Sequence, residues 1–316
     1  MSRIYEALQK AESDRKLDRS ELEQALPDPE PIRSAMMPTA VAEIEEPAVP
    51  VAVVERTVEP YEPEIVRAGL SLSNVARYAW TPAVDRLPAL QERGPGVEQF
   101  RSLRSRIYEL RDIKPLKSIL ISSGLPQEGK SFVAMNLAIS LSRHKSSKVL
   151  LIDGDMRRYT LHQMLGTEAH PGLADYLAGK ATMFEVMQRM AESAEGGKGA
   201  VANLANLTFI PGGNGGDKAA DLSGNPRFAE LIRAVSPYFD WIVVDSSPVL
   251  PVSDAVNLAR ACDGVLLVAR SGVTKYPVAQ RAQSELKASN ILGFVLNAVA
   301  NPPQVGSYYG YDAETE

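Results

Sequence analysis

The chain has 316 residues, of which 45% are hydrophobic and 23% charged, so it is long and apolar enough to form one or two globular domains with a sizeable core. Its formal net charge of -5 argues against a general nucleic-acid-binding surface and leaves room only for a local basic patch. A single cysteine, Cys262, excludes an internal disulfide and a cysteine-rich zinc site. We expect it to be a small buried thiol in a reducing cytoplasm.

The N-terminal residues predict neither a membrane span nor a secretion signal. No apolar run approaches the roughly 18 residues of a membrane helix, and the opening "MSRIYEALQKAESDRK" lacks the apolar centre of a signal peptide. Residues 1–26 are predicted to form a polar helix with a narrow apolar stripe at Ile4, Leu8 and Ala11. Such a stripe is typical either of a marginal, solvated helix or of one that docks onto a partner. We expect a cytoplasmic protein that reaches the inner membrane through a partner.

Residues 27–90 are predicted to be a disordered linker. Prolines interrupt helix and sheet in "PDPEPIRSAMMPTAVAEIEEPAVPVAVVERTVEPYEPE", and its acidic side chains repel one another. Residues 70–94 are ambiguous, because "LSLSNVARYAW" could also pack onto the following domain as a short arm. A folded domain over 91–301 and a flexible tail over 302–316 complete the predicted organisation.

From residue 97 onward, strand-like and helix-like segments alternate. The strand-like runs are short and continuously apolar, which is typical of parallel strands buried on both faces; they are Ser118–Ile121, Val149–Ile152, Leu207–Ile210, Trp241–Val244, Gly264–Ala269 and Gly293–Leu296. Helical stretches are predicted between several of them, at Ser131–Arg143, Pro226–Ser236, Ser253–Ala261 and Tyr276–Ser289. The alternation predicts an α/β fold with a doubly wound, mostly parallel sheet.

The stretch "GLPQEGKS" matches the phosphate-binding pattern G-x-x-x-x-G-K-[ST] without a gap. Its glycines let the loop curl so that backbone N–H groups point at phosphate oxygens, and the helix that follows adds its positive N-terminal end. Lys130 can bridge the β- and γ-phosphates, and the Ser131 hydroxyl can bind Mg²⁺. A strand before the loop and a helix after it supply the context that the motif requires, so we expect a nucleoside triphosphate here.

Acidic residues end two further predicted strands. Asp153 and Asp155 follow "VLLI", and Asp245 follows "WIVV". Because parallel strands end at the same edge of a sheet, these carboxylates should face the crevice that holds the phosphate loop. Such a cluster needs a cation, and Mg²⁺ is the expected one. For Asp155 the alternative is a helix N-cap, and for the other two it is a purely structural role.

These motifs resemble those of the bacterial tyrosine kinases, P-loop kinases of capsule and exopolysaccharide export that are related to the ParA and MinD ATPases. The stretches "SSGLPQEGKS", "VLLIDGDMRR" and "DWIVVDSSPVLPVSDA" look like the family's Walker A, Walker A′ and Walker B motifs, and "EQFRSLR" and "GLADYLAGK" match further elements. The resemblance covers residues 97–301 and then the tail. The opening "MSRIYEALQKAE" is similar to the start of cytoplasmic members that lack a membrane domain. Those members imply a separate membrane partner, a chain-length-determinant or activator protein.

The resemblance implies an ATP-dependent tyrosine autokinase that regulates exopolysaccharide polymerisation and export. By position, Asp153 would be the base for the incoming tyrosine hydroxyl, and Asp155 and Asp245 would hold Mg²⁺ together with Ser131. Lys130 would act with these acids in catalysis. ATP would be bound by the whole loop, which comprises Gly124, Leu125, Pro126, Gln127, Glu128, Gly129, Lys130, Ser131 and Phe132.

Two further elements of the family concern assembly. Glu98, Arg101 and Arg104 form its E-x-x-R-x-x-R element, which implies self-association into a ring; the alternative is a solvated face with local ion pairs. A tyrosine cluster at the C-terminus implies phosphorylation by a neighbouring subunit, and the alternative is an unmodified flexible tail. Its members are Tyr308, Tyr309 and Tyr311.

The sequence also departs from the family pattern. Gln127 stands where glycine is common, which matters if that residue needs a positive φ. Tyr159 stands where proline usually follows the Walker A′ arginine, and "PGGNGGDKAADLSGNPRF" lacks a proline-rich turn. Two rival functions remain: a partitioning ATPase of the MinD or ParA type, and a nucleotide-gated scaffold. The first is disfavoured because Leu125 occupies the position of those ATPases' extra lysine.

Overall fold

The computed structural model describes residues 71–144, 147–191 and 204–300, which all fall within one compact unit, Glu59–Glu316. The predicted N-terminal helix, most of the predicted linker and the tail tyrosines lie outside these residues. Among the helices that are described, none has the length and apolar character needed to cross a membrane.

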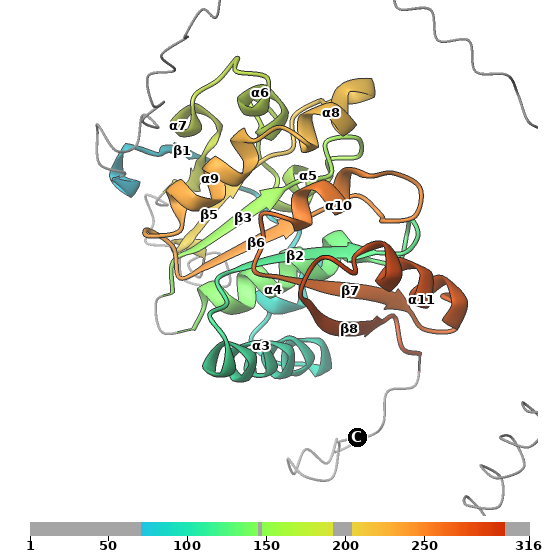
Figure 1. Cartoon of the computed structure of the whole chain (residues 1–316). Helices are drawn as coiled ribbons and strands as arrows, with labels where there is room; N and C mark the ends of the chain where they lie inside the picture. Colours follow the sequence, from blue (N-terminus) through green and yellow to red (C-terminus); the bar gives the residue numbers. More distant parts are fainter. Residues whose placement is uncertain (1–70, 145–146, 192–203, 301–316) are drawn as a thin grey trace, which may run out of the picture. The chain divides into compact units, whose positions relative to one another are not determined.

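A single eight-stranded sheet organises the described residues (Figure 1). Its spatial order is β1-β4-β5-β3-β6-β2-β7-β8, and all neighbouring strands are parallel except the pair β4 and β5. The strands are β1 Ala76–Tyr78, β2 Ser118–Ser123, β3 Val149–Asp153, β4 Gln188–Met190, β5 Leu207–Ile210, β6 Trp241–Asp245, β7 Gly264–Arg270 and β8 Ile291–Asn297. The prediction of a doubly wound, mostly parallel P-loop fold is thus confirmed.

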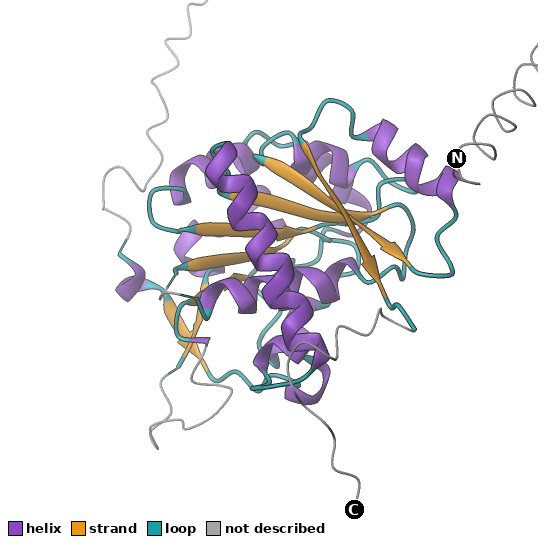
Figure 2. Cartoon of the chain, turned by 90° about the horizontal axis from the view of Figure 1, so that it is seen from below, coloured by secondary structure: helices purple, strands orange, loops and turns teal. Residues whose placement is uncertain are grey.

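Strand residues alternate between two hydrophobic clusters, one on each face of the sheet. In β3, for example, Leu150 and Ile152 belong to one cluster, and Val149 and Leu151 belong to the other. Both faces are therefore covered, which is why these strands are apolar throughout. Figure 2 shows helices on the two sides of the sheet.

The helices cover those two faces. Helix α4 lies against one face together with α3, and residues Val133 to Ser142 of α4 are all buried. Residues of α6, α8, α9 and α10 belong to the cluster on the other face. The helices are α3 Pro95–Ile113, α4 Lys130–Ser142, α5 Leu161–Leu165, α6 Leu173–Leu177, α7 Met183–Val186, α8 Ala219–Ser223, α9 Arg227–Val235, α10 Asp254–Ala259 and α11 Tyr276–Glu285.

The segment before α3 packs onto the domain, so the predicted linker boundary at residue 90 is wrong. Trp80, Leu87 and Leu90 are buried in the cluster beneath α4, and the Trp80 ring meets Phe209 edge-on at 6.4 Å. Strand β1 also adds hydrogen bonds to the sheet through its pairing with β4. Burial of the apolar side chains of this arm stabilises the packed conformation, although the preceding prolines and acidic residues are typical of disorder.

Cys262 is half-buried, and its Sγ lies 3.6 Å from the carbonyl oxygen of Leu258. Cys262 as a whole is thus less buried than the sequence predicts, but burial of its sulfur raises the pKa of this thiol, which keeps it protonated and unreactive.

Candidate functional site

The phosphate loop joins β2 to α4 and curls as its motif requires. Gly129 is the residue that precedes α4, and its φ of 95° lies in the left-handed region that favours glycine. A Cβ at this position would lie 2.0 Å from Nδ2 of Asn297. The second glycine of the motif is therefore required both by its backbone conformation and by the side chain packed against it.

A buried glutamate braces the loop from within. The Glu128 carboxylate accepts a hydrogen bond from the backbone N–H of Leu125 at 2.8 Å and a second from the Thr274 hydroxyl. Nδ2 of Asn297 donates to the Glu128 carbonyl oxygen at 3.0 Å. Sequence reasoning missed Thr274 and Asn297, because no motif marks them and they come from the distant segments that follow β7 and end β8.

Gln127, which stands where glycine is common in the family, adopts the left-handed backbone conformation that favours glycine. Its φ is 65°, and Nη1 of Arg270 lies 3.4 Å from its carbonyl oxygen. A residue with a Cβ is disfavoured in this left-handed region by roughly 1–2 kcal/mol. The loop therefore carries strain at a position where glycine would carry none.

Lys130 joins the phosphate loop to the acidic corner after β3. Its Nζ donates to Oδ2 of Asp155 at 2.8 Å and to Oγ of Ser131 at 3.2 Å. Burial on its own would lower the pKa of Lys130, but the carboxylates of Asp245 and Asp155 outweigh it and raise that pKa. Lys130 therefore remains a cation and lies beside Asp155 in the acidic corner.

Asp153 is fully buried, and each of its oxygens accepts a backbone N–H, from Asp155 at 3.2 Å and from Leu161 at 3.1 Å. Burial above all, and then the neighbouring Asp245, raises its pKa well above the usual range. A carboxyl with a raised pKa is able to hold a proton near neutral pH. Its two hydrogen bonds also shape the turn that carries Asp155.

Asp245 differs from Asp153 in its hydrogen bonding. It is fully buried, yet within the described part of the chain neither of its carboxylate oxygens has a hydrogen-bond partner. Burial raises the pKa of Asp245 to about 6, and the Lys130 charge limits the rise. The nearby Ser131 hydroxyl also lowers the pKa of Asp245, although its position does not meet the geometric criteria of a hydrogen bond. A buried acid with two open oxygens is suited to bind a proton or a cation.

Strand register brings these acids together. Asp153 and Asp245 are paired directly across β3 and β6, and the Gly154 N–H donates to the Asp245 carbonyl oxygen at 2.8 Å. A Cβ on Gly154 would lie 2.5 Å from that oxygen. The glycine between the two aspartates of "DGD" therefore allows the two strand ends to approach.

This donor set fits Mg²⁺ that is bound mainly through phosphates and water. No group of three or more acidic, histidine or cysteine side chains in the described ranges forms a metal cage. The open oxygens of Asp245, with Ser131 and Asp155 beside them, could provide the few carboxylate and hydroxyl ligands that Mg²⁺ takes from a protein at such sites. Asp155 is not a helix N-cap, because the next helix, α5, begins only at Leu161; its carboxylate instead accepts the Arg158 N–H at 3.0 Å within the turn after β3.

The loop after β5 packs against this acidic corner without a proline-rich turn. The Gly215 N–H donates to the Met156 carbonyl oxygen at 3.0 Å, and a Cβ on Gly212 would lie 2.6 Å from Cβ of Tyr159. Pro211 accepts the Leu173 N–H at 2.7 Å. The glycines of "PGGNGG" thus permit the close approach to Tyr159, and the "GLADYL" helix docks on the same loop.

The predicted assembly residues divide into two kinds. Glu98 and Arg101 are exposed on α3 and pair with each other. Arg104 is only partly exposed, and its Nη1 donates to the Ser140 carbonyl oxygen at 2.9 Å near the end of α4. Arg104 therefore has a structural contact within the chain, whereas Arg101 is available to a neighbour.

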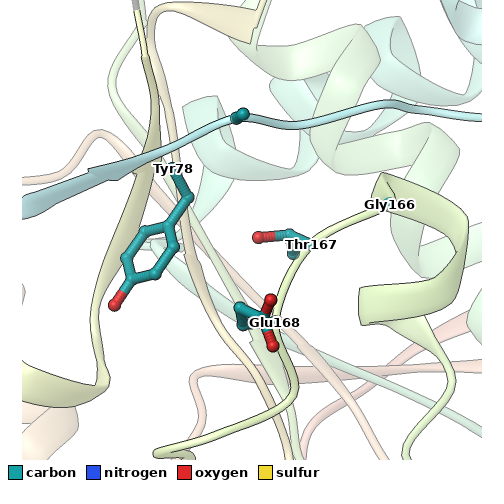
Figure 3. A pocket seen from close by; sticks show the side chains of 5 residues that line it. Tyr78, Gly166, Thr167 and Glu168 are labelled. Carbon is teal, nitrogen blue, oxygen red and sulfur yellow. The ribbon is translucent and has the colours of Figure 1, made fainter.

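A separate hollow of ≈ 280 Å³ lies between the arm and the turn after α5. Figure 3 shows Tyr78, Gly166, Thr167 and Glu168 around it. None of its lining residues belongs to the phosphate loop or the acidic corners, so the hollow is no part of the candidate site.

Comparison with known proteins places this geometry among named kinases. No family model matches the chain. Tyrosine-protein kinase YwqD of Bacillus subtilis is 32% identical over 216 residues, which cover 68% of this chain and 85% of YwqD. Tyrosine-protein kinase wzc of Salmonella typhimurium is 32% identical over 227 residues, which cover 70% of this chain. The match spans only 30% of the length of wzc.

Solved structures agree with these relatives. The kinase domain of Escherichia coli tyrosine kinase ETK superposes with a TM-score of 0.61 at 27% identity, covering 75% of this chain and 87% of that domain. The BceF tyrosine kinase domain, with a TM-score of 0.56 at 24% identity, shares the fold.

Proposed function

Because the chain belongs to the family of bacterial tyrosine-protein kinases, we propose that it transfers the γ-phosphate of ATP to tyrosine hydroxyls, including those of its own C-terminal tail. One observation carries the proposal. The Lys130–Asp155 ion pair of 2.8 Å joins the phosphate loop to the acidic corner, close to the open carboxylate of Asp245. Phosphoryl transfer needs this combination of positioning and charge neutralisation.

Nucleotide binding would rest on residues 124–132. Backbone N–H groups of the loop and the N-terminus of α4 would face the phosphates, and Lys130 would turn from Asp155 to the β- and γ-phosphates. Glu128 and Gly129 keep the loop in shape through their contacts with Thr274 and Asn297. Bound Mg²⁺ would neutralise phosphate charge, with Ser131, Asp155 and Asp245 as the residues that hold it.

Asp153 would accept the proton of the incoming tyrosine. A phenol has a pKa near 10 and keeps its proton at neutral pH, so its attack is helped by a carboxylate acceptor. The raised pKa of Asp153, caused first by burial, suits a group that takes up a proton during the reaction. Its two backbone hydrogen bonds hold the carboxyl in place and leave lone pairs for that proton.

The partners are proposed from the relatives. The chain would assemble into a ring through the exposed Glu98–Arg101 face, and a separate membrane protein would bring it to the inner membrane. Exopolysaccharide or capsule assembly would be the process it regulates. Phosphates on Tyr308, Tyr309 and Tyr311 would each add about -1.5 to -2 charges, and their repulsion would loosen the ring.

The test is tyrosine phosphorylation of the purified chain by ATP and Mg²⁺, followed by anti-phosphotyrosine blotting and mass-spectrometric mapping. Wild type should acquire phosphate on the tail, and Lys130→Met should not. Lys117→Met is the matched control, because Lys117 contacts the Ser236 carbonyl oxygen outside the loop. Mixing the Lys130→Met chain with an active chain that lacks the tail tests transfer between subunits.

The results separate the proposal from its rivals. Phosphotyrosine on the inactive chain supports kinase activity in trans. ATP hydrolysis without phosphotyrosine would instead support a partitioning-type ATPase, and nucleotide binding without either reaction would support a scaffold.

A further inference from the structure

Arg157 and Asp254 form a forked ion pair between the two acidic motifs. Nε of Arg157 donates to Oδ2 of Asp254 at 2.7 Å, and Nη2 donates to Oδ1 at 3.3 Å. The Asp254 side chain is 1% exposed and that of Arg157 is 32% exposed. The two residues are 97 positions apart in the sequence, so only the fold brings them together.

Each partner belongs to a segment that carries a proposed active-site acid. Arg157 lies in the turn after β3, two residues beyond Asp155, and Asp254 is the first residue of α10, in the segment that follows Asp245. Residues 246–250, which lie between Asp245 and α10, are in turn hydrogen-bonded to the phosphate loop, because the Leu250 N–H donates to the Gly124 carbonyl oxygen at 3.2 Å. The ion pair therefore ties the turn after β3 to the chain that flanks the phosphate loop.

Stability alone is a weak reason for such a pair. The desolvation of a buried acid offsets most of the attraction, and apolar side chains of similar size often serve as well or better. What a two-pronged arginine–carboxylate contact adds is a defined distance and orientation between the elements that it joins. Arg157 also lies close enough to Asp155 and Asp217 for their negative charges to favour its protonated form.

We infer that Arg157 and Asp254 are positioning residues, whose forked contact holds the turn at 153–158 in register with the Asp245 segment and so orients Asp153 and Asp155 for phosphoryl transfer. This inference rests on the proposed kinase function. It assigns no contact with ATP or with the acceptor to either residue. Its effect is expected in the rate of the chemical step and in the rigidity of the turn.

The experiment compares Asp254→Asn, Arg157→Lys and the double variant with Asp263→Asn. Asn keeps the shape of Asp254 and removes its charge, and Lys keeps the charge of Arg157 and removes the fork. Asp263 is the matched control, because its carboxylate accepts the backbone N–H groups of Lys117 and Ser118 at 2.8 Å, where β2 begins rather than where it ends. Full-length protein is assayed for kcat, for ATP affinity by calorimetry and for thermal stability.

Asp254→Asn and Arg157→Lys should each lower kcat by at least about tenfold, because small misplacements of reacting groups are costly. ATP affinity should change by less than about threefold, and the double variant should be no slower than the slower single variant, since both break the same contact. Hydrogen exchange of the nucleotide-free protein should speed up in peptides covering 153–161. Asp263→Asn should show neither effect.

A kcat loss in Asp254→Asn no larger than in Asp263→Asn of similar stability, or unchanged exchange at 153–161, would overturn the inference. The inference would also be overturned if the fold loss of kcat in the double variant equalled the product of the losses in the two single variants. If wild type forms no phosphotyrosine, the proposed function fails, and the positioning inference is still decided by the exchange measurement.

Discussion

Lys130 and Asp155, 25 residues apart in the chain, form an ion pair of 2.8 Å between Nζ and Oδ2 in which both side chains are largely buried. The pair holds the lysine at the acidic corner. Binding of a triphosphate at the proposed site would therefore exchange one anionic partner of Lys130 for another.

Replacing Lys130 with Met should weaken ATP binding by about tenfold to a hundredfold, because each charge-assisted contact that is lost contributes roughly 1.5–3 kcal/mol. Calorimetric titration with ATP and Mg²⁺ measures this loss. Lys117→Met should bind ATP like wild type. Equal affinities for the Lys130 variant and wild type would contradict the proposed role.

Asp245→Asn should stabilise the nucleotide-free protein at neutral pH. Burial raises the pKa of Asp245 from 3.8 to about 6, so the folded chain binds more protons than the unfolded chain between these values. The stability of wild type then falls as pH rises through this window. The penalty is fully present above about pH 6 and amounts to at most about 3 kcal/mol.

Denaturant unfolding at several pH values checks this expectation. The gain of Asp245→Asn over wild type should be present near pH 7.5 and absent below about pH 4, because the aspartate is then neutral as well. A variant less stable than wild type at the higher pH would show that the Asp245 charge is compensated in the folded state.

Gln127→Gly should leave the protein equally stable or stabilise it by up to about 1 kcal/mol, because the relief of left-handed strain is partly offset by the entropy of glycine in the unfolded chain. Gln127→Val should destabilise it by about 1 kcal/mol or more, since a β-branched residue is least compatible with a φ of 65°. Chemical denaturation of both variants measures the difference. The reverse order of stabilities would refute the strain.

Gly154→Ala should destabilise the fold by about 1–3 kcal/mol through overpacking. The new methyl would lie 2.5 Å from the Asp245 carbonyl oxygen and 2.9 Å from Cδ1 of Leu258. Gly224→Ala is the control, because its nearest neighbour would be 3.6 Å away. Thermal unfolding of the two variants should differ; equal midpoints would mean that the strand ends separate freely.

Arg101→Glu should alter self-association without unfolding the chain, whereas Arg104→Ala should cost about 1.5–3 kcal/mol of stability by removing a charged donor from the Ser140 carbonyl oxygen. Light scattering reports the first effect and denaturation the second. An unchanged assembly state for Arg101→Glu would leave the exposed Glu98–Arg101 pair as surface.

The sequence by itself determined the fold class and the location of the phosphate loop. Strands such as Val149–Asp153 have apolar side chains on both faces because helices cover both faces of the sheet. The resulting run of consecutive apolar residues can be recognised in the sequence alone. The loop is equally local, since glycines, lysine and serine at fixed spacing are all that a strand-to-helix turn needs to face phosphates. Asp153, Asp155 and Asp245 were identifiable as candidates because Asp153 and Asp245 end such strands and Asp155 follows two residues later.

Only the tertiary structure decided which of these groups are free and what braces them. Two positions of the loop favour glycine in the folded chain. Gln127 has a left-handed φ, and Asn297 packs closely against Gly129. Both features depend on how β7 and β8 pack beside β2. The Arg157–Asp254 contact joins residues 97 positions apart, and no periodicity encodes such a distance. Hydrophobic pattern specifies elements and their faces, whereas hydrogen-bond partners of buried polar groups are chosen by the assembled fold.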